Sequence, residues 1–578
     1  MKPTATLAYR NIPDSYGTNA YLSDPDFAHL LRIYLDGDVM AAVEPHFVEL
    51  GSLVRGEMES LALAADRNPP VLHLRARNSS DLQKIEKHPS YIALERYAFS
   101  EFGLAAMSHR GDVFGRAEKL PPAVKYGLTM LFVQAEFGLC CPLSMTDSLT
   151  RTLCKFGSKD LIDRFFPMLT TQTFEDLYQG AMFITEQDAG SDVGAVTTEA
   201  RLENGFWRLY GDKWFCSNPD ADLAMVLARP QGGAPGTKGL SLFLLPRRLD
   251  DGTLNAYRIL RLKPKLGTRS MASGEIVLEG AVAHLVGEPA SGFKQMTDMI
   301  NMSRLSNGVR SAGLMLRAVG EAHYIARNRT AFGKALIDLP LMRRQLIKMT
   351  VTAEQGRAMC LHTAEILRRA DAGDPLYAGL MRIMTPLIKF RTCRDARKVA
   401  GDGMEARGGG GYIEEWSDAR VLRDAHLGSI WEGTSNVVAL DVKRAIRREQ
   451  SLEALKTYAA QLLGNSGIPA PSREKLAVAH ARACALAEAV VNAPEREEDV
   501  RRMASALYNA TSAIILAWEA ARSGRWRRLA LAHLVLQHKL LPQDPLAASR
   551  DNPALIDSLI GHHEIDADLA ATALPGTC

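Results

Sequence analysis

Residues 429–436 have the sequence SIWEGTSN and place Glu432 between Trp431 and Gly433, just before an apolar segment that begins at Val437. A bulky indole can shield a carboxylate from water, while the glycine leaves the backbone open to a ligand. Desolvation raises the pKa of a carboxyl group and makes its carboxylate a stronger base. The stretch therefore predicts a catalytic base or, alternatively, a solvent-facing glutamate at a helix N-terminus.

A glycine run comes shortly before this carboxylate. Residues 406–412 have the sequence ARGGGGY and follow a segment with helical periodicity. Glycines let a ligand approach the backbone closely, and the free N–H groups of such a break can hold phosphate. The run is therefore a candidate phosphate contact.

Two further motifs lie in a strand-rich region. Residues 182–193, MFITEQDAGSDV, form an apolar strand that ends in a turn rich in hydroxyls, where backbone N–H groups can meet a polar ligand. Residues 211–218, GDKWFCSN, put adjacent aromatic side chains on opposite faces of a strand, so one of them can lie against a planar ligand. Each motif alone is also compatible with ordinary strand and turn structure, and neither is a GxGxxG dinucleotide fingerprint.

A basic segment closes the next long helix that the sequence predicts. Residues 327–334 have the sequence RNRTAFGK. Basic residues followed by glycine are typical of a helix C-terminus, but arginine can also hold a phosphate through two hydrogen bonds. Both interpretations remain open from this segment alone.

The chain has 578 residues, enough for about three or four domains. Helical periodicity dominates residues 1–178, and short strands fill 179–290, where Asn204-Gly205 indicates a β-hairpin. Long helices return in 291–449, and a further helical module occupies 450–578. The sequence thus predicts a mainly α protein with a β insert.

Composition excludes several classes of function. The net charge of +3, from 69 basic and 66 acidic residues, gives no global attraction to nucleic acid or membrane. The eight cysteines form no CxxC pair, which predicts reduced thiols in a cytoplasmic protein and no metal site. No signal peptide and no apolar run of about 18 residues is found, so we expect no membrane span.

The four motifs, in this order, resemble the acyl-CoA dehydrogenase superfamily from about residue 142 to 448. Residues 19–23 (NAYLS), 68–70 (NPP) and 266–270 (LGTRS), with the C-terminal extension, are most similar to its AidB-like branch, flavoproteins of the bacterial adaptive response to alkylation. The resemblance implies the acyl-CoA dehydrogenase fold, with an N-terminal helical domain, a central β-barrel domain and a C-terminal four-helix bundle. An extra C-terminal helical module would follow.

The resemblance also implies FAD, with its flavin between the β domain and the second helical bundle. The residues that match the family's cofactor contacts are Met182, Phe183, Ile184, Thr185, Gly190, Ser191, Phe215, Cys216, Ser217, Arg329, Phe332, Gly408, Gly409, Thr434 and Asn436. Four of these, Arg329, Phe332, Gly408 and Gly409, would reach the FAD of a neighbouring subunit. A homotetramer is the implied assembly.

The implied reaction is α,β-dehydrogenation of an acyl-CoA thioester. Glu432 would take the α-proton while hydride leaves the β-carbon for flavin N5, and the backbone N–H of Glu432 would polarise the thioester carbonyl. Ser191, Asn301, Arg304 and Gly433 would contact the substrate. Reduced FAD would pass its electrons to an electron-transfer flavoprotein.

The sequence departs from the family pattern at a few positions. Phe215 stands where many members have Trp, and Pro340 and Glu405 stand where Gln is usual. The last two bear on the implied FAD contacts between subunits. Ser303 replaces an alternative glutamate base that some members carry, so Glu432 has no rival there.

Two other functions stay open. The AidB-like branch suggests a flavoprotein that binds duplex DNA and has weak or no dehydrogenase activity. Basic clusters at 443–448 and 525–528 favour that hypothesis, although residues 437–578 hold 17 basic against 16 acidic side chains. A flavin oxidase or monooxygenase is the third hypothesis. Glu432 argues against it, because related nitroalkane oxidases carry Asp there and the hydroxylases generally lack this Glu.

Overall fold

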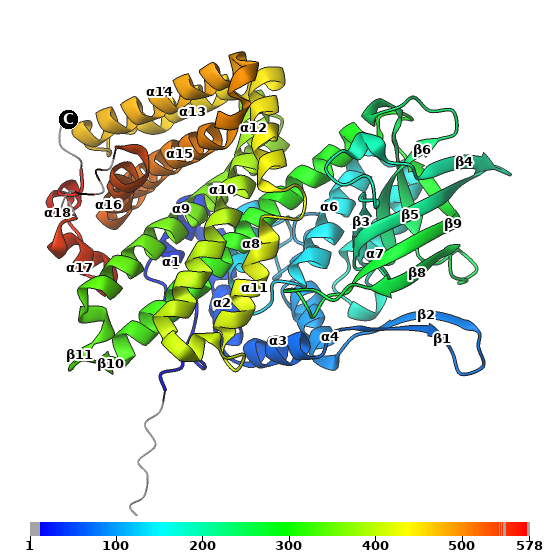
Figure 1. The fold of residues 1–578 in the computed structure, drawn as a ribbon, viewed down its shortest axis with the longest axis horizontal. Helices are drawn as coiled ribbons and strands as arrows, with labels where there is room; N and C mark the ends of the chain where they lie inside the picture. Colours follow the sequence, from blue (N-terminus) through cyan, green and yellow to red (C-terminus); the bar gives the residue numbers. More distant parts are fainter. Residues whose placement is uncertain (1–11, 543, 545, 547–550, 575–578) are drawn as a thin grey trace, which may run out of the picture.

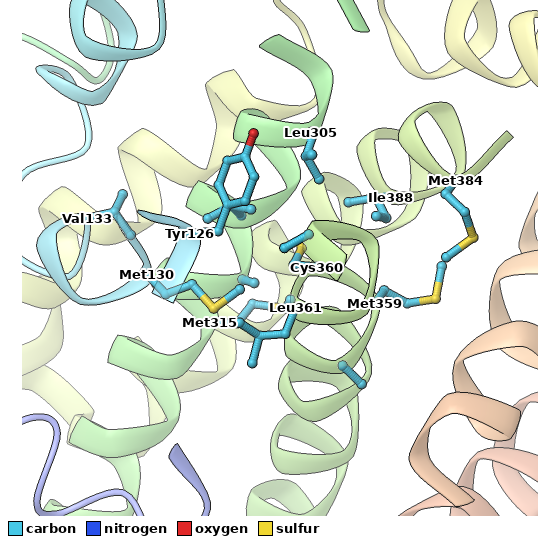
Figure 2. Packing of buried hydrophobic residues seen from close by; sticks show 14 of the residues in the cluster. Tyr126, Met130, Val133, Leu305, Met315, Met359, Cys360, Leu361, Met384 and Ile388 are labelled. Carbon is cyan, nitrogen blue, oxygen red and sulfur yellow. The ribbon is translucent and has the colours of Figure 1, made fainter. Parts of the chain in front are cut away.

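Long helices form the centre of the molecule (Figure 1). The computed structural model describes residues 12–542, 544, 546 and 551–574. The central helices are α8 (Gly292–Asn328), α9 (Pro340–Asp371), α10 (Pro375–Arg407) and α12 (Ser435–Glu449). Figure 2 shows Met130 of α5 (Pro122–Phe132) beside Met315 of α8, with further buried side chains of α9 and α10 such as Met359 and Ile388. This apolar core fixes the helices that surround the predicted base.

Helices pack on the bundle from both ends of the sequence. On the N-terminal side these are α1 (Phe27–Tyr34), α2 (Gly37–Leu53), α3 (Glu57–Arg67), α4 (Pro89–Arg96), α5 (Pro122–Phe132), α6 (Cys140–Phe156) and α7 (Lys159–Thr170). On the C-terminal side these are α11 (Ser417–Gly428), α13 (Ser451–Leu463), α14 (Ala470–Asn492), α15 (Val500–Ser523), α16 (Trp526–Val535), α17 (Pro553–Gly561) and α18 (Ala567–Ala571). The extra C-terminal helical module that the resemblance implied is thus present.

The β domain lies at the other end of the molecule from the C-terminal helices (Figure 1). Its strands are β3 (Gly180–Phe183), β4 (Glu199–Glu203), β5 (Phe206–Ser217), β6 (Leu223–Pro230), β7 (Ser241–Pro246), β8 (Tyr257–Leu262) and β9 (Ser273–Val286). The pairing runs from β6 through β4, β5, β9 and β7 back to β6, so the sheet closes on itself. Asn204 and Gly205 form the turn between β4 and β5, which confirms the predicted hairpin.

A strand pair interrupts the N-terminal helical region, where the sequence predicted mostly helix. Strands β1 (Val71–Arg75) and β2 (Asp81–Glu86) form a hairpin beside the β domain (Figure 1). Ile85 is buried in the core of that domain. The side chain of Gln83 accepts a hydrogen bond from Ile259 N at 2.7 Å, and its carbonyl accepts one from Arg247 Nη2 at 3.2 Å. The partner that stabilises these strands is distant in sequence, so local propensity did not reveal them.

Buried ion pairs join the C-terminal module to the rest of the chain. Arg528 Nε donates to Glu519 at 2.9 Å, and its Nη1 reaches Glu354 of α9. Arg527 Nε donates to Asp26 at 3.0 Å. Burial alone would raise the pKa of Asp26, but the surrounding arginines outweigh it and hold that pKa at about 2.

These contacts correct one interpretation of the sequence. The cluster at 525–528 was a candidate phosphate-binding patch, but Arg527 and Arg528 are buried and paired with carboxylates. They hold helices together and are not available to DNA. The cluster at 443–448 lies on α12, where Arg444, Arg447 and Arg448 are exposed.

Two further predictions concern disulfide bonds and membrane spans. The seven cysteines within the described ranges are free thiols, and Cys578 lies outside those ranges, as does the start of the chain that bears on a signal peptide. Within the described ranges, no helix combines the length and the hydropathy needed to cross a bilayer.

Replacing Arg528 by Met tests the ion pairs. Removal of the guanidinium leaves Glu354 and Glu519 buried without it, so we expect the free energy of unfolding to fall by about 3–5 kcal/mol. Urea denaturation followed by circular dichroism measures this. The control is Arg258→Met, whose pair with Glu279 is solvent-exposed and should leave the midpoint almost unchanged. Equal midpoints for both variants would contradict the proposed role of Arg528.

Candidate active site

Glu432 lies in the loop between α11 and α12, outside either helix. Its backbone has φ 56° and that of Gly433 has φ 104°. A positive φ is costly for a residue with a side chain and persists only where the surroundings enforce it. Thr434 is the N-cap of α12, so Glu432 precedes the helix rather than facing solvent within its first turn.

Two cations hold this loop. Lys389 of α10 donates to the carbonyl oxygens of Gly428 at 2.8 Å and Gly433 at 3.0 Å, on either side of Glu432. Arg304 of α8 donates to the Glu432 carbonyl at 3.4 Å and to Asp441 Oδ2 of α12 at 2.6 Å. Burial lowers the pKa of Lys389 to about 8. The loop is thus fixed to three helices of the bundle.

Glu432 is half-buried, and its Oε2 atom is shielded from water. Burial raises its pKa, and the Ser303 hydroxyl and the charges of Arg310 and Lys389 oppose that rise without cancelling it. Within the described residues, Glu432 Oε2 has no hydrogen-bond partner. A buried carboxylate with a free oxygen and a raised pKa has the properties of a general base.

An aromatic wall stands beside the base. The indole of Trp431 stacks on Phe137 with a centroid distance of 5.6 Å and an angle of 18°. The guanidinium of Arg310 lies over the Trp431 ring at 4.7 Å. Trp431 is therefore fixed by packing, as the shielding of Glu432 requires.

The two strand motifs are joined by a buried ion pair. Lys213 of β5 contacts Glu186 at 2.6 Å and also donates to the carbonyl oxygens of Ile184 and Leu227. The backbone N–H of Trp214 donates to Thr185 O at 2.8 Å. These contacts place the ends of β3 and β5 side by side.

Alternation along the strands divides the predicted cofactor residues into two sets. Met182, Ile184, Thr185, Phe215 and Ser217 keep part of their surface accessible, and Phe215 is 58% exposed. Phe183 and Cys216 point the other way, into the core of the β domain, so only their backbone can face a ligand. The exposed turn that follows β3 carries Gly190 and Ser191.

Cys141, at the start of α6, connects the strand face to the base. Burial raises the pKa of its thiol, as does the Glu432 carboxylate, while Arg310 and the Ser217 hydroxyl lower it. Ser217 and Glu432 therefore share one neighbour. Ser217 thus contacts the thiol on which the charge of the predicted base acts, and Thr434 and Asn436 lie exposed just beyond that base in the sequence.

The other predicted cofactor residues form a second group at the far end of α8. Arg329 Nη1 donates to Arg407 O at 3.0 Å, next to Gly408 and Gly409. Phe332 is 94% exposed on the hairpin of β10 (Thr330–Ala331) and β11 (Lys334–Ala335), at the end of the molecule away from the β domain (Figure 1).

This second group is distant from the base within one chain. Arg329 follows Arg304 by 25 residues along α8, and a rise of about 1.5 Å per residue puts them about 37 Å apart. Arg304 touches Glu432, so the structure does not bring the two groups of residues together in a single copy.

Several residues at the site were not predicted from the sequence. Lys389 and Arg310 lie in the middle of long helices, where a single cation has no distinguishing sequence pattern. Lys213 and Glu186 stood inside the motifs but had no assigned role. Asn301, a predicted substrate contact, is half-buried with its Oδ1 unpaired among the described residues. Within the same residues, no group of three or more His, Cys, Asp or Glu is placed to hold a metal ion.

Comparison with known domain families divides the chain into three consecutive parts. The N-terminal domain of the adaptive response protein AidB matches residues 11–176, the acyl-CoA dehydrogenase middle domain matches 181–281, and the acyl-CoA dehydrogenase C-terminal domain matches 290–447. These are the regions that carry the N-terminal helices, the strand face and the base.

Individual relatives span most of the chain. Acyl-CoA dehydrogenase family member 11 of Caenorhabditis elegans is 31% identical over 460 residues, which cover 78% of this chain and 74% of that protein. AidB of Escherichia coli strain K12 is 33% identical over 473 residues, which cover 79% and 83%. The crystal structure of Caenorhabditis elegans ACDH-11 in complex with C11-CoA has a TM-score of 0.85 at 26% identity and covers 94% of each chain. Fold, domain order and relatives together show that the chain belongs to the acyl-CoA dehydrogenase family, in its AidB-like branch.

Proposed function

We propose that the protein is an FAD-dependent acyl-CoA dehydrogenase in which Glu432 removes the α-proton of an acyl thioester. One observation carries the proposal. The Glu432 carboxylate is buried with a free oxygen and a raised pKa, and it shares Cys141 as a neighbour with Ser217 on the strand face. The arrangement supports a base and a flavin that would border one place, which α,β-dehydrogenation needs.

The strand face fits a flavin. Met182, Ile184 and Phe215 offer apolar surface, and Thr185 and Ser217 add hydroxyls at its edge. A planar ring with polar edges needs this combination. Bound FAD would supply the hydride acceptor.

The backbone N–H of Glu432 would also act in the reaction, as a hydrogen-bond donor to the substrate. The N–H of Glu432 donates to no acceptor in the part of the chain that the structure describes. It is free to donate to the thioester carbonyl, where it would stabilise the charge that develops as the α-proton leaves. Lys389 and Arg304 would hold that N–H in place through the neighbouring carbonyl groups. Asn301, Ser191 and Gly433 remain the proposed substrate contacts.

The distant group of cofactor residues supports an assembly. Arg329, Phe332, Gly408 and Gly409 would contact the FAD of another copy, because they lie too far from Glu432 to serve their own. An exposed Phe332 also favours an interface, since a protruding aromatic side chain gains from burial. We propose a homotetramer with an electron-transfer flavoprotein as its electron acceptor.

DNA binding is less well supported. Of the two basic clusters that favoured it, the one at 525–528 has Arg527 and Arg528 buried in ion pairs, and only the one at 443–448 has several exposed arginines. A single exposed cluster is common on solvated helices. Dehydrogenation is therefore the stronger proposal.

Glu432→Gln removes the base and keeps its size. Anaerobic addition of acyl-CoAs of varied length should bleach the oxidised flavin band of the unmodified protein. The variant should keep its FAD but bleach about 10²–10⁴-fold more slowly. Glu279→Gln, on the surface of the β domain, is the control. Bleaching of Glu432→Gln at the unmodified rate would remove Glu432 from this role.

The pH profile follows from the raised pKa of Glu432. The free enzyme needs the carboxylate form, so kcat/KM should rise as pH increases through that pKa and then level off. Ser303→Ala removes a hydroxyl that lowers the pKa of Glu432, so it should shift this limb to higher pH. Initial rates across the pH range measure both. A shift toward lower pH would contradict the assignment.

Mixed oligomers test the contribution of a second copy. Arg329→Ala should lower FAD content without unfolding, because the side chain is exposed. Co-expressed with Glu432→Gln, it should form oligomers in which an intact Glu432 meets FAD held by an intact Arg329 of its neighbour. Activity above that of either variant alone is expected. Additive residual activities would show that each copy holds its own FAD.

A further inference from the structure

Arg310 of α8 is fully buried, and within the described residues it makes no ion pair with a carboxylate. Its Nε donates to Ser306 O at 3.3 Å and its Nη2 to Asn307 Oδ1 at 2.9 Å, while Nη1 has no partner among the described residues. Arg357 and Arg528 are equally buried, yet each pairs with three carboxylates. A buried guanidinium without an anion is costly, so its retention points to a missing partner.

Arg310 belongs to a polar stripe that leads away from the base. Ser303, Asn307 and Arg310 follow each other at spacings of four and three residues, which places them on one face of α8. Ser303 lies beside Glu432, and Arg310 lies over Trp431. The stripe thus begins at the reacting position and ends about 10 Å further along the helix.

The far part of the stripe and the neighbouring indole carry polar atoms that have no hydrogen-bond partner. Within the described residues these are Asn307 Nδ2, Arg310 Nη1 and Trp431 Nε1. Buried polar groups are nearly always satisfied, so this cluster points to the place of a ligand. All three can donate a hydrogen bond, which calls for a ligand rich in acceptors.

The charges around Glu432 also indicate an anionic ligand. Asp441 is shared by Arg304, Arg382 and Arg444, so it offsets only part of the charge of Arg304. Glu432 is the carboxylate on which the charges of both Arg310 and Lys389 act. Positive charge is therefore in excess around the base. A saturated hydrocarbon chain would satisfy neither this charge nor the orphaned donors, whereas a carboxylate would satisfy both.

We propose that the substrate is an acyl-CoA whose acyl chain ends in a carboxylate, and that this carboxylate pairs with Arg310. The inference rests on the proposed function, since it names the substrate class of the same site. Ser303 would line the chain near the α-carbon, and Asn307 and Arg310 would receive its far end. The Arg310 side chain folds back to Ser306 and Asn307, so its guanidinium lies about 5–6 Å along the helix from Ser303, which suits a straight chain of about six carbons.

Binding in a protein that cannot turn over tests this directly. Holoenzyme carrying Glu432→Gln is titrated with adipyl-CoA and with hexanoyl-CoA, which differ only in the terminal carboxylate, and Kd is read from the flavin spectrum. Adipyl-CoA should bind at least tenfold more tightly. Adding Arg310→Met in the same background should abolish or reverse the preference, and Arg310→Lys should keep part of it.

The outcomes separate the two proposals. Equal or tighter binding of hexanoyl-CoA to the protein with Arg310 in place overturns the inference, whether or not Arg310→Met folds. FAD content and thermal unfolding show whether that variant is intact. If adipyl-CoA binds preferentially but neither thioester bleaches the flavin of the unmodified protein, dehydrogenation fails and the acidic-chain inference stands.

Discussion

The charges that are paired inside the protein decide how its parts meet. Arg357 and Arg528 are buried, so moving a helix that carries one of their carboxylate partners would leave a buried charge without its counter-ion, which is costly. Asp26 enters from the N-terminal side and Glu519 from the C-terminal module, with Glu354 of α9 between them. The central bundle is therefore held from both ends of the chain. Inside the β domain, Lys213 and Glu186 form another buried ion pair, which fixes the ends of β3 and β5.

The base loop depends on this rigid frame. Glu432 adopts a left-handed backbone conformation that the loop alone would not favour, and cations from α8 and α10 hold the carbonyl groups around it. The arrangement separates two requirements of a general base. Backbone contacts fix the position of the loop, while the carboxylate keeps a free oxygen and a raised pKa.

Local patterns in the sequence predicted a mainly α protein with a β insert and singled out Glu432 and the two strand motifs, because each has a short-range signature. Asn204-Gly205 indicated a hairpin, and Trp431 and Gly433 on either side of Glu432 indicated a shielded carboxylate. The acyl-CoA dehydrogenase fold itself was implied by the family resemblance. The strand period of two also explains why Phe183 and Cys216 turn inward although their neighbours remain accessible. Family resemblance added the cofactor and the role of the distant group around Arg329.

Non-local contacts could not be predicted in this way. Lys389 and Arg310 contact the loop around Glu432 only because the fold brings α8 and α10 to it. Nothing in their sequence neighbours distinguishes them from solvated cations. At Arg527 and Arg528 the prediction failed in the other direction. A run of arginines suggested an exposed phosphate-binding patch, but both side chains are buried. Whether a charge is buried depends on partners from other elements, which a single sequence does not reveal.

The hairpin of β1 and β2 has a consequence for how the chain reaches this state. Ile85 fills part of the interior of the β domain, and Gln83 completes hydrogen bonds at its edge, yet both are synthesised long before the strands they join. During translation the hairpin therefore cannot pack against the β domain until the strands of that domain have left the ribosome. The β domain cut out by itself would keep a gap where Ile85 belongs, so its independent folding would stop short of the packing seen in the whole chain.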